Sequence, residues 1–217
     1  MKELRKIQAT PENSILVIVD MQKGDTAVDR NPYWWVHEEA QPELSTRTAI
    51  VPAVARLLER AREAGVRVIH VQSSRTHLER EIKVFGSDLT HKIGSWDSEI
   101  FDELMPEPRE IVVRKWCHDP WHETDMERVM EGVVPDPTKC QVLITGGGVL
   151  GCAEYSIMGF YVRNYQVAVV LDAVYSGPTA GAKHYSRTSY PAFPSISLTK
   201  SDLIQFSRVA EPVAAGR

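Results

Sequence analysis

Residues 15–20 of the chain read Ile-Leu-Val-Ile-Val-Asp, a continuous run of branched apolar residues that ends in a carboxylate. A run of this kind, bounded by polar residues, is typical of a strand buried on both faces of a sheet. Further short apolar runs that predict strands lie at residues 66–71, 111–114, 141–145, 167–171 and 196–198.

Longer stretches with helical spacing lie between these runs. One predicted helix spans residues 46–64, where apolar side chains recur on one stripe before Gly65 stops the helix. Further helices are predicted near residues 98–104 and over 124–133, 152–164 and 201–209. Strands that alternate with helices indicate βαβ units. The pattern therefore predicts an α/β fold with three layers, α/β/α, around a mainly parallel sheet of about six strands.

Length and composition are those of a folded globular protein. The chain has 217 residues, 43% hydrophobic and 25% charged, which is too apolar for a disordered chain. We expect one domain over residues 1–217, with its core at about 14–209. Lys and Arg number 25 against 29 Asp and Glu, a net charge of −4. That balance gives no electrostatic reason to expect a nucleic-acid partner.

The three cysteines are Cys117, Cys140 and Cys152. An odd and sparse set is a poor disulfide framework and suits a reducing compartment. Residues 1–14 are polar and lack the apolar core of a secretory signal, and no apolar run approaches the ~20 residues that a membrane helix needs. We therefore expect a cytoplasmic protein with no membrane partner.

Reactive side chains stand where three of the predicted strands end. Asp20 follows the first strand, Lys115 follows the third, and Cys152 opens a helix after a glycine-rich turn that follows the fourth. Ligands of parallel sheets bind beyond the carboxyl ends of the strands. Each residue alone has an ordinary interpretation, as a turn former, a solvated cation or a small buried residue.

Together the three groups are the parts that a nucleophilic amide hydrolase needs. A helix N-terminus and a nearby ammonium are expected to lower the pKa of the Cys152 thiol. The Asp20 carboxylate can accept the thiol proton and return it to a leaving amine. Amide N–H groups at the start of the helix can stabilise the oxyanion.

Three segments resemble the isochorismatase-like cysteine hydrolases, which include nicotinamidases, N-carbamoylsarcosine amidohydrolases and ureidoacrylate amidohydrolases. They are residues 16–22, residues 115–126 and residues 145–152, and the resemblance covers roughly residues 14–173. It implies a Rossmann-like strand order. It also implies hydrolysis of a small carboxamide or ureido C–N bond through a thioester, in a homodimer or homotetramer.

The resemblance also assigns roles to individual residues. It implies a catalytic triad of Asp20, Lys115 and Cys152, with no cofactor and no metal. It implies a cis peptide bond between Gly147 and Gly148, which would aim the Gly148 N–H, with that of Cys152, at the carbonyl oxygen of the substrate. Such a bond is rare outside proline and occurs at functional sites.

The sequence departs from the family pattern at two places. Lys23-Gly24-Asp25 stands where relatives often have Asn-Asp-Phe. Metal-binding nicotinamidases carry Asp-x-His after the second strand, whereas residues 73–77 here read Ser-Ser-Arg-Thr-His. The resemblance therefore disfavours a nicotinamidase.

Substrate contacts are expected from aromatic and basic residues near the strand ends. Aromatic side chains can wall a small pocket and exclude water, and Arg75 can bind a carboxylate; core packing and a surface cation are the ordinary alternatives. The candidate substrate-binding residues are Trp34, Trp35, Arg75, His77, Trp121 and Tyr155.

Several other functions stay open. Gly146, Gly148 and Gly151 spell GxGxxG before a helix, and Asp172 follows about 20 residues later, which is the fingerprint of an NAD(P)-binding oxidoreductase. That fingerprint usually lies in the first βα unit, however, and here it follows the fourth strand. A vinyl-ether hydrolase of the isochorismatase type and a binding or assembly module are further alternatives.

A metal site is another alternative. His118 and His122 have the i, i+4 spacing of zinc ligands on a helix. Pro120 lies between them, which disfavours a helix there. The ordinary interpretation is a polar loop that lines the pocket.

Overall fold

The computed structural model describes residues 3–25, 41–76, 79–85, 91–134, 136–148, 151–175 and 193–208. The strands in these ranges are β1 (Ile7–Ala9), β2 (Ser14–Val19), β3 (Arg67–Ser73), β4 (Ile111–Lys115), β5 (Gln141–Gly146), β6 (Gln166–Val174), β7 (Ile196–Thr199) and β8 (Ile204–Phe206). The α-helices are α1 (Gln41–Ala64), α2 (Glu79–Phe85), α3 (Met126–Val133) and α4 (Cys152–Tyr161). Within the same ranges, single 3₁₀ turns lie at Lys23–Asp25, Trp96–Ser98, Asp102–Leu104, Pro137–Lys139 and Ser201–Leu203.

The central sheet has six strands in the order β4-β3-β2-β5-β6-β7, and all its pairings are parallel. This confirms the predicted parallel sheet. The chain runs outward from β2 to β4, returns to β5 beside β2, and then runs outward in the other direction. Its order therefore reverses between β2 and β5, the kind of position at which open α/β sheets bind ligands.

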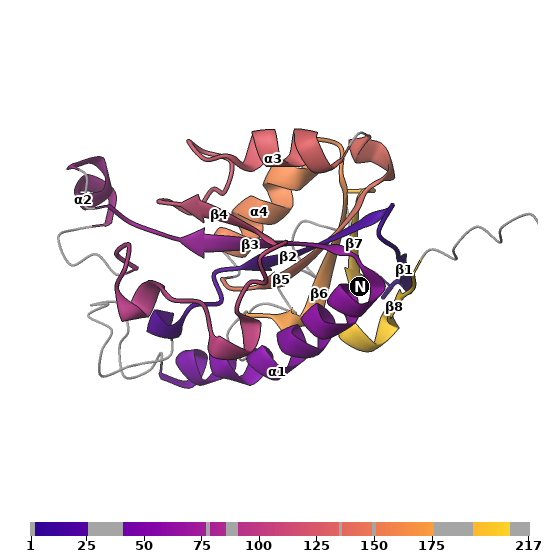
Figure 1. The fold of residues 1–217 in the computed structure, drawn as a ribbon, viewed down its shortest axis with the longest axis horizontal. Coiled ribbons are helices and arrows are strands. Elements are labelled where there is room, and N and C mark those ends of the chain that lie inside the picture. The colour runs from indigo at the N-terminus through magenta and orange to yellow at the C-terminus, as the bar shows by residue number, and fades with distance from the viewer. Residues whose placement is uncertain are drawn as a thin grey trace, which may run out of the picture.

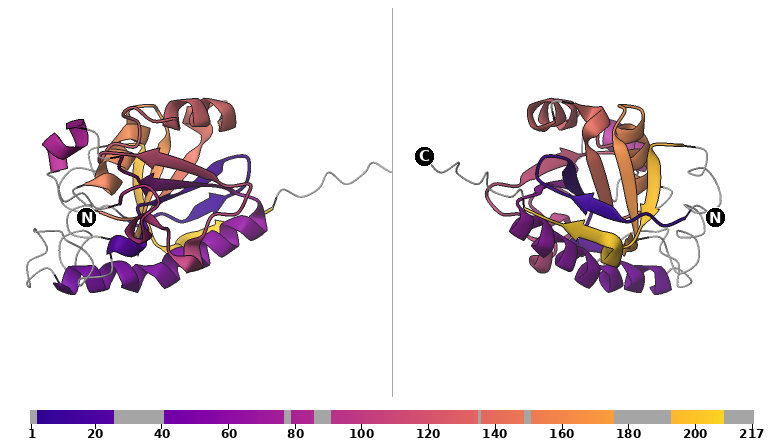
Figure 2. Two further views of the ribbon diagram at one scale, coloured as in Figure 1. Left: turned by 60° about the vertical axis from the view of Figure 1, so that its left-hand side comes forward. Right: turned by 90° about the vertical axis from the view of Figure 1, so that its right-hand side faces the viewer.

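Helices cover both faces of this sheet (Figures 1 and 2). Helix α1 lies on one face, and α3 and α4 lie on the other. All six residues of β2 are buried, and its side chains alternate between the two layers. Leu16 and Ile18 belong to the same apolar cluster as Leu57 of α1, whereas Val17 belongs to the cluster that contains Phe160 of α4. The predicted three layers are thus confirmed.

The C-terminal region corrects one prediction. The helix predicted over residues 201–209 is wrong, because Ser201–Leu203 forms only one 3₁₀ turn and β8 follows. Ile204 is buried while Gln205 is exposed, which is the two-residue period of a strand. Strand β8 pairs in parallel with β1, with Ile204 opposite Ile7, in a second sheet of two strands.

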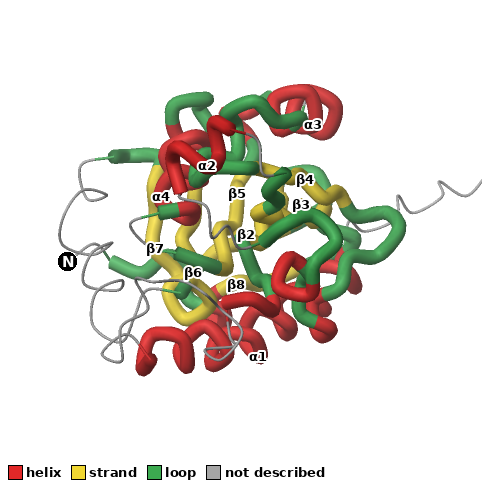
Figure 3. The backbone as a smooth tube through the Cα atoms, turned by 90° about the vertical axis from the view of Figure 1, so that its left-hand side faces the viewer, coloured by secondary structure: helices red, strands yellow, loops and turns green. Residues whose placement is uncertain are grey.

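The carboxyl ends of β3 and β4 point to the left in Figure 1, and Figure 3 faces that edge. The carboxyl edge of the sheet therefore lies toward the viewer in Figure 3. Within the described ranges, none of the helices has the length and apolar character needed to span a lipid bilayer.

Candidate active site

Asp20 sits at the carboxyl end of β2 in an unusual backbone conformation. Its φ is 47°, in the left-handed region that non-glycine residues seldom adopt. Its N–H donates to the Val71 carbonyl oxygen of the neighbouring strand at 2.9 Å, and the residue is buried. Strain of this kind is concentrated at functional sites.

Lys115, the last residue of β4, joins the predicted triad. Its Nζ lies 2.9 Å from Asp20 Oδ2 and 3.0 Å from Cys152 Sγ. It also donates to Ser73 Oγ at 2.9 Å and to the Cys117 carbonyl oxygen at 3.1 Å. The side chain is fully buried. Burial opposes the charge, but Asp20 and Cys152 together outweigh it through their charges and hydrogen bonds, so the pKa of Lys115 lies above its ordinary value.

The glycine turn after β5 fits against the end of β2. Gly146 has a φ of +93°, and a Cβ there would lie 2.1 Å from the Val19 carbonyl oxygen, so only glycine is accommodated. The Gly147 N–H donates to that same oxygen at 2.6 Å. The turn thereby places the start of α4 beside Asp20.

The predicted cis peptide bond between Gly147 and Gly148 is wrong. The described residues contain no cis peptide bond. The turn reverses the chain through the positive φ of Gly146 and of Gly148, which is 52°. Such angles are open to glycine without steric cost, and the bond between Gly147 and Gly148 is trans.

Cys152 is the first residue of α4. The Gly148 carbonyl oxygen accepts the N–H groups of Gly151 and Ala153, both at 3.1 Å, which fixes the turn against the helix. The N–H groups of Gly148 and Cys152 have no acceptor among the described residues. Both are therefore available as donors, as the predicted oxyanion hole requires.

The ionisation of the Cys152 thiol differs from the expectation. Burial raises its pKa to about 12, the negative charge of Asp20 adds to the shift, and the Lys115 ammonium only partly offsets it. The prediction of a lowered pKa is therefore wrong, because it neglected burial and the adjoining carboxylate. The resting group is a thiol, and it needs a proton acceptor before it can attack.

Two polar residues that were not predicted as site residues hold the triad in place. Ser73 Oγ donates to Asp20 Oδ1 at 3.2 Å and accepts from Lys115. The Gln22 amide donates to the carbonyl oxygens of Ser73 and Ser98 and accepts the Ser73 N–H, each at 2.8 Å. The signal for Ser73 is its position, since it ends the strand beside Asp20.

His118 is a further neighbour of the thiol. Its Nδ1 lies 3.2 Å from Cys152 Sγ, and its ring stacks on that of Tyr155 with centroids 6.1 Å apart. Tyr155, a predicted substrate contact, is thus adjacent to the site through His118. The expectation of a polar loop at the pocket included His118 but not its contact with the sulfur.

The zinc alternative gains no support from this arrangement. The His122 ring packs near Trp116, with centroids 5.6 Å apart, whereas His118 contacts Cys152. In the described part of the chain, no group of three or more His, Cys, Asp or Glu residues could hold a metal ion.

The remaining predicted contacts fall in different places. Arg75 is buried just after β3, and its charge helps to lower the pKa of His118, so it lies near the site. Trp121 instead packs in the core, with its ring 5.0 Å from Phe160 and 4.0 Å from the Arg163 guanidinium. Trp34, Trp35 and His77 lie outside the described residues.

The dinucleotide-binding alternative depends on Asp172 as the ribose ligand. Its Oδ1 accepts the Ser201 N–H at 2.8 Å, and its Oδ2 accepts the Ser201 hydroxyl at 2.5 Å. Both oxygens therefore hold the connection after β7. The glycine turn, for its part, positions the thiol.

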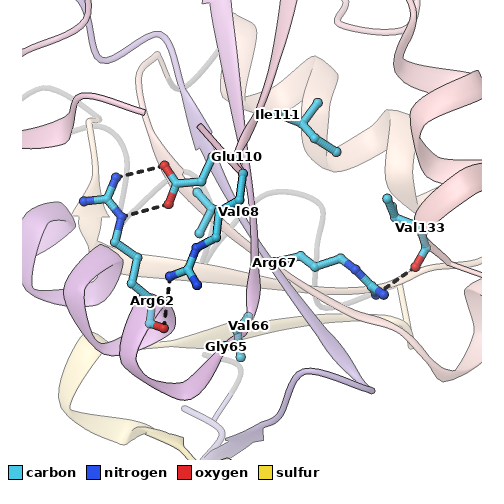
Figure 4. Close-up of a pocket in the computed structure, with 9 residues that line it drawn as sticks. Arg62, Gly65, Val66, Arg67, Val68, Glu110, Ile111 and Val133 are labelled. Atoms are coloured by element: carbon cyan, nitrogen blue, oxygen red, sulfur yellow. Dashed lines mark hydrogen bonds and ion pairs between the residues drawn. The ribbon is translucent and has the colours of Figure 1, made fainter. Parts of the chain in front are cut away.

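A cavity of about 230 Å³ lies at the other edge of the sheet, where β3 and β4 begin (Figure 4). Its lining includes Arg62, Arg67, Arg109 and Glu110 but no cysteine, serine or histidine. Glu110 receives two hydrogen bonds from Arg62, both at 2.8 Å, as Figure 4 shows. This cavity therefore contains a structural ion pair and lacks a nucleophile.

Glu110 provides a prediction about stability. Hydrogen bonds from Arg62, from the Glu107 N–H and from His70 outweigh burial and lower its pKa to about 2, from 4.5. A lowered pKa stabilises the folded state above pH 4.5, and this contribution is lost as the pH falls through about 2. We expect Glu110→Gln to lower the free energy of unfolding at pH 7 by about 2 kcal/mol.

Urea denaturation at pH 7 and pH 3 measures this difference. The gap between wild type and Glu110→Gln should be smaller at pH 3, where part of the carboxylate's contribution is already lost. Glu59 of α1 is exposed and forms no ion pair with an arginine or histidine of the described residues, so Glu59→Gln is the control, with a small effect at both pH values. If wild type and Glu110→Gln differ by the same free energy of unfolding at both pH values, the ion pair of Glu110 is not the source of the difference.

Comparison with known proteins identifies relatives of the chain. Residues 14–193 match the isochorismatase domain model. The chain is 25% identical over 199 residues to ureidoacrylate amidohydrolase RutB of Acinetobacter baylyi, covering 81% of this chain and 76% of that protein. It is 27% identical over 166 residues to a secreted isochorismatase effector of Verticillium dahliae, covering 76% and 74%.

Solved structures have the same fold. A cysteine hydrolase from Pseudomonas syringae pv. phaseolicola superposes with a TM-score of 0.72 and 22% identity, covering 93% of this chain and 94% of that one. N-carbamoylsarcosine amidase from Thermoplasma acidophilum gives a TM-score of 0.66 and 22% identity, covering 88% and 97%. At these identities the likeness concerns the fold.

Proposed function

The chain belongs to the isochorismatase family of hydrolases, and from this premise we propose that it hydrolyses a small carboxamide or ureido C–N bond through a thioester on Cys152. One observation carries the proposal. Lys115 Nζ lies within 3.0 Å of both the Asp20 carboxylate and the Cys152 sulfur. A carboxylate, an ammonium and a thiol thus meet at the position where the strand order reverses.

The first half of the reaction forms the thioester. Asp20 accepts the thiol proton as the sulfur attacks the carbonyl carbon, and Lys115 stabilises the developing thiolate. The Gly148 and Cys152 N–H groups stabilise the oxyanion. Asp20 then donates the proton to the leaving nitrogen, the C–N bond breaks, and ammonia or an amine departs. In the second half, water cleaves the thioester and the thiol is restored.

Two relatives support an amide or ureido substrate. One is named for the hydrolysis of ureidoacrylate and another for that of N-carbamoylsarcosine, and both names describe C–N bonds beside a carbonyl. The half-buried thiol of Cys152 supports the same chemistry, because a covalent nucleophile is suited to acyl transfer.

A substrate panel tests this proposal. Carboxamides, ureido acids and N-carbamoyl amino acids are incubated with the protein, and ammonia or amine release is measured, alongside isochorismate as a vinyl ether. We expect C–N hydrolysis of at least one amide or ureido compound and its loss in Cys152→Ala. Cleavage of the vinyl ether alone would overturn the proposal in favour of the isochorismatase-type alternative.

Replacing Lys115 by methionine tests the role of the ammonium. The positive charge of Lys115 lowers the pKa of the Cys152 thiol against burial and Asp20, so its loss should raise that pKa further. We expect the iodoacetamide alkylation rate of Cys152, followed by peptide mass spectrometry, to shift to higher pH. Lys139→Met, which replaces an exposed lysine that pairs with Asp136, is the control. An unshifted profile in Lys115→Met would deny Lys115 this role.

A further inference from the structure

His118 contacts the reactive sulfur from a part of the chain that the triad does not use. It belongs to the connection between β4 and α3, and its Nδ1 lies 3.2 Å from Cys152 Sγ. The residue is exposed, whereas Lys115 reaches the same sulfur from a fully buried position. A candidate base for a water molecule should lie between the sulfur and solvent.

Both carboxylate oxygens of Asp20 already have partners, so we looked for another group that could activate water in the second half of the reaction. Asp20 Oδ2 pairs with Lys115 at 2.9 Å, and Oδ1 accepts from Ser73 at 3.2 Å. A neutral imidazole is matched to proton transfer near neutral pH, and His118 Nδ1 lies beside the sulfur that carries the acyl group. The chemistry therefore favours His118 for the step in which water attacks.

We propose that His118 is the general base of thioester hydrolysis. This inference rests on the proposed function, since it requires an acyl group on Cys152. With the ring proton on Nε2, Nδ1 accepts a proton from water as its oxygen bonds to the carbonyl carbon. The C–S bond breaks, the carboxylic or carbamic acid leaves, and Nδ1 passes the proton to Sγ over the observed 3.2 Å.

The surroundings of His118 keep its imidazole neutral. Desolvation is the largest effect, and the cations Lys115 and Arg75 act in the same direction, while the Asp20 carboxylate opposes them, so the pKa of His118 lies below 6.5. Tyr155 of α4 stacks on the ring. A general base must be unprotonated, so hydrolysis should slow as the pH falls through this lowered pKa.

The start of α4 lies beside the ring of His118. A Cβ on Gly151 would lie 3.7 Å from His118 Nδ1, at ordinary contact distance. The ring of Tyr155, in the first turn of α4, stacks on the imidazole.

p-Nitrophenyl acetate separates the two half-reactions, because p-nitrophenolate leaves when the thiol is acylated and acetate leaves only on hydrolysis. In His118→Asn, an amide nitrogen or oxygen can keep the hydrogen bond near the Nδ1 position but cannot act as the base. We expect a burst of p-nitrophenolate close to one equivalent per protein, and then turnover slowed about 10²–10⁴-fold. Peptide mass spectrometry should find acetyl-Cys152.

Two additions bypass the missing base. Hydroxylamine, which attacks a thioester without a base, should restore the turnover of His118→Asn. Added imidazole should raise the rate of His118→Ala, since it can occupy the vacated place. His122→Asn, an exposed histidine of the same connection, is the matched control and should behave like the wild type, including its loss of rate at low pH.

The outcomes separate this inference from the proposed function. If His118→Asn turns over like the wild type, or slows without a burst and without rescue by hydroxylamine, the role of His118 is overturned while Cys152 stands. If Cys152→Ala shows the same burst and turnover as the wild type, the nucleophile itself is overturned and the inference with it.

Discussion

Cys152→Ala is expected to abolish hydrolysis of the substrate that the panel identifies. The sulfur lies 3.0 Å from Lys115 Nζ and 3.2 Å from His118 Nδ1, and alanine offers no atom that can bond to the carbonyl carbon. Cys152→Ser should also lose at least about 10³-fold in kcat/KM, because a hydroxyl is far harder to ionise than a thiol. Rates are measured by amine release.

Folding must be checked in the same variants. Cys152 is half-buried at the start of α4, so a small substitution should leave the far-UV circular dichroism and the cooperative unfolding transition intact. Cys140→Ala, a buried cysteine at the start of β5, controls for loss of a thiol elsewhere and should retain turnover. Wild-type turnover by Cys152→Ala would remove the nucleophile from the mechanism.

Asp20→Asn is expected to separate catalysis from thiol reactivity. Asparagine keeps the shape of the side chain but cannot accept the thiol proton, so kcat should fall about 10²–10⁴-fold. The Asp20 charge raises the pKa of Cys152, whereas Lys115 lowers it. Removing the carboxylate while keeping the ammonium should therefore lower that pKa. Cys152 alkylation should move to lower pH while turnover is lost.

The opposite signs make this pair of variants informative. Lys115→Met should slow both turnover and alkylation, whereas Asp20→Asn should slow turnover and speed alkylation. A variant that merely disturbs the site would slow both readouts, so the faster alkylation expected of Asp20→Asn is the result that a disturbed site does not give. If Asp20→Asn slows alkylation in parallel with turnover, the assignment of Asp20 as the proton acceptor fails.

The central sheet and the convergence of the triad could be predicted from the sequence for one physical reason. A strand buried on both faces has a continuous apolar run, as β2 does, and the carboxyl ends of parallel strands meet at one edge. Asp20, Lys115 and the glycine turn before Cys152 each follow such a run. Position along the chain therefore predicted proximity in space.

Other features depend on contacts that no local pattern contains. Trp121 had the position of a pocket residue, but its ring packs against α4 at Gly159. A Cβ on Gly159 would lie 2.2 Å from Trp121 Nε1, so this packing needs glycine there. The contact of His118 with the sulfur depends on the path of an irregular connection. The pKa of Cys152 depends on burial and on Asp20, whereas the sequence drew attention to the helix start and to Lys115.

The short sheet of β1 and β8 was missed for a related reason. Each strand has three residues, too few for periodicity to distinguish a strand from a turn or a helix end. Their pairing joins residues about 200 positions apart in the chain, with Ile7 opposite Ile204. Only the completed fold brings the two segments together.

The most direct test of the central claim is rapid acid quenching during turnover of the amide substrate, followed by peptide mass spectrometry. The peptide containing Cys152 is expected to gain the mass of the acyl group. The gain should disappear in Cys152→Ala together with the activity. An acyl group on a different side chain, or an unmodified Cys152 during a full burst of released amine, would contradict the central claim.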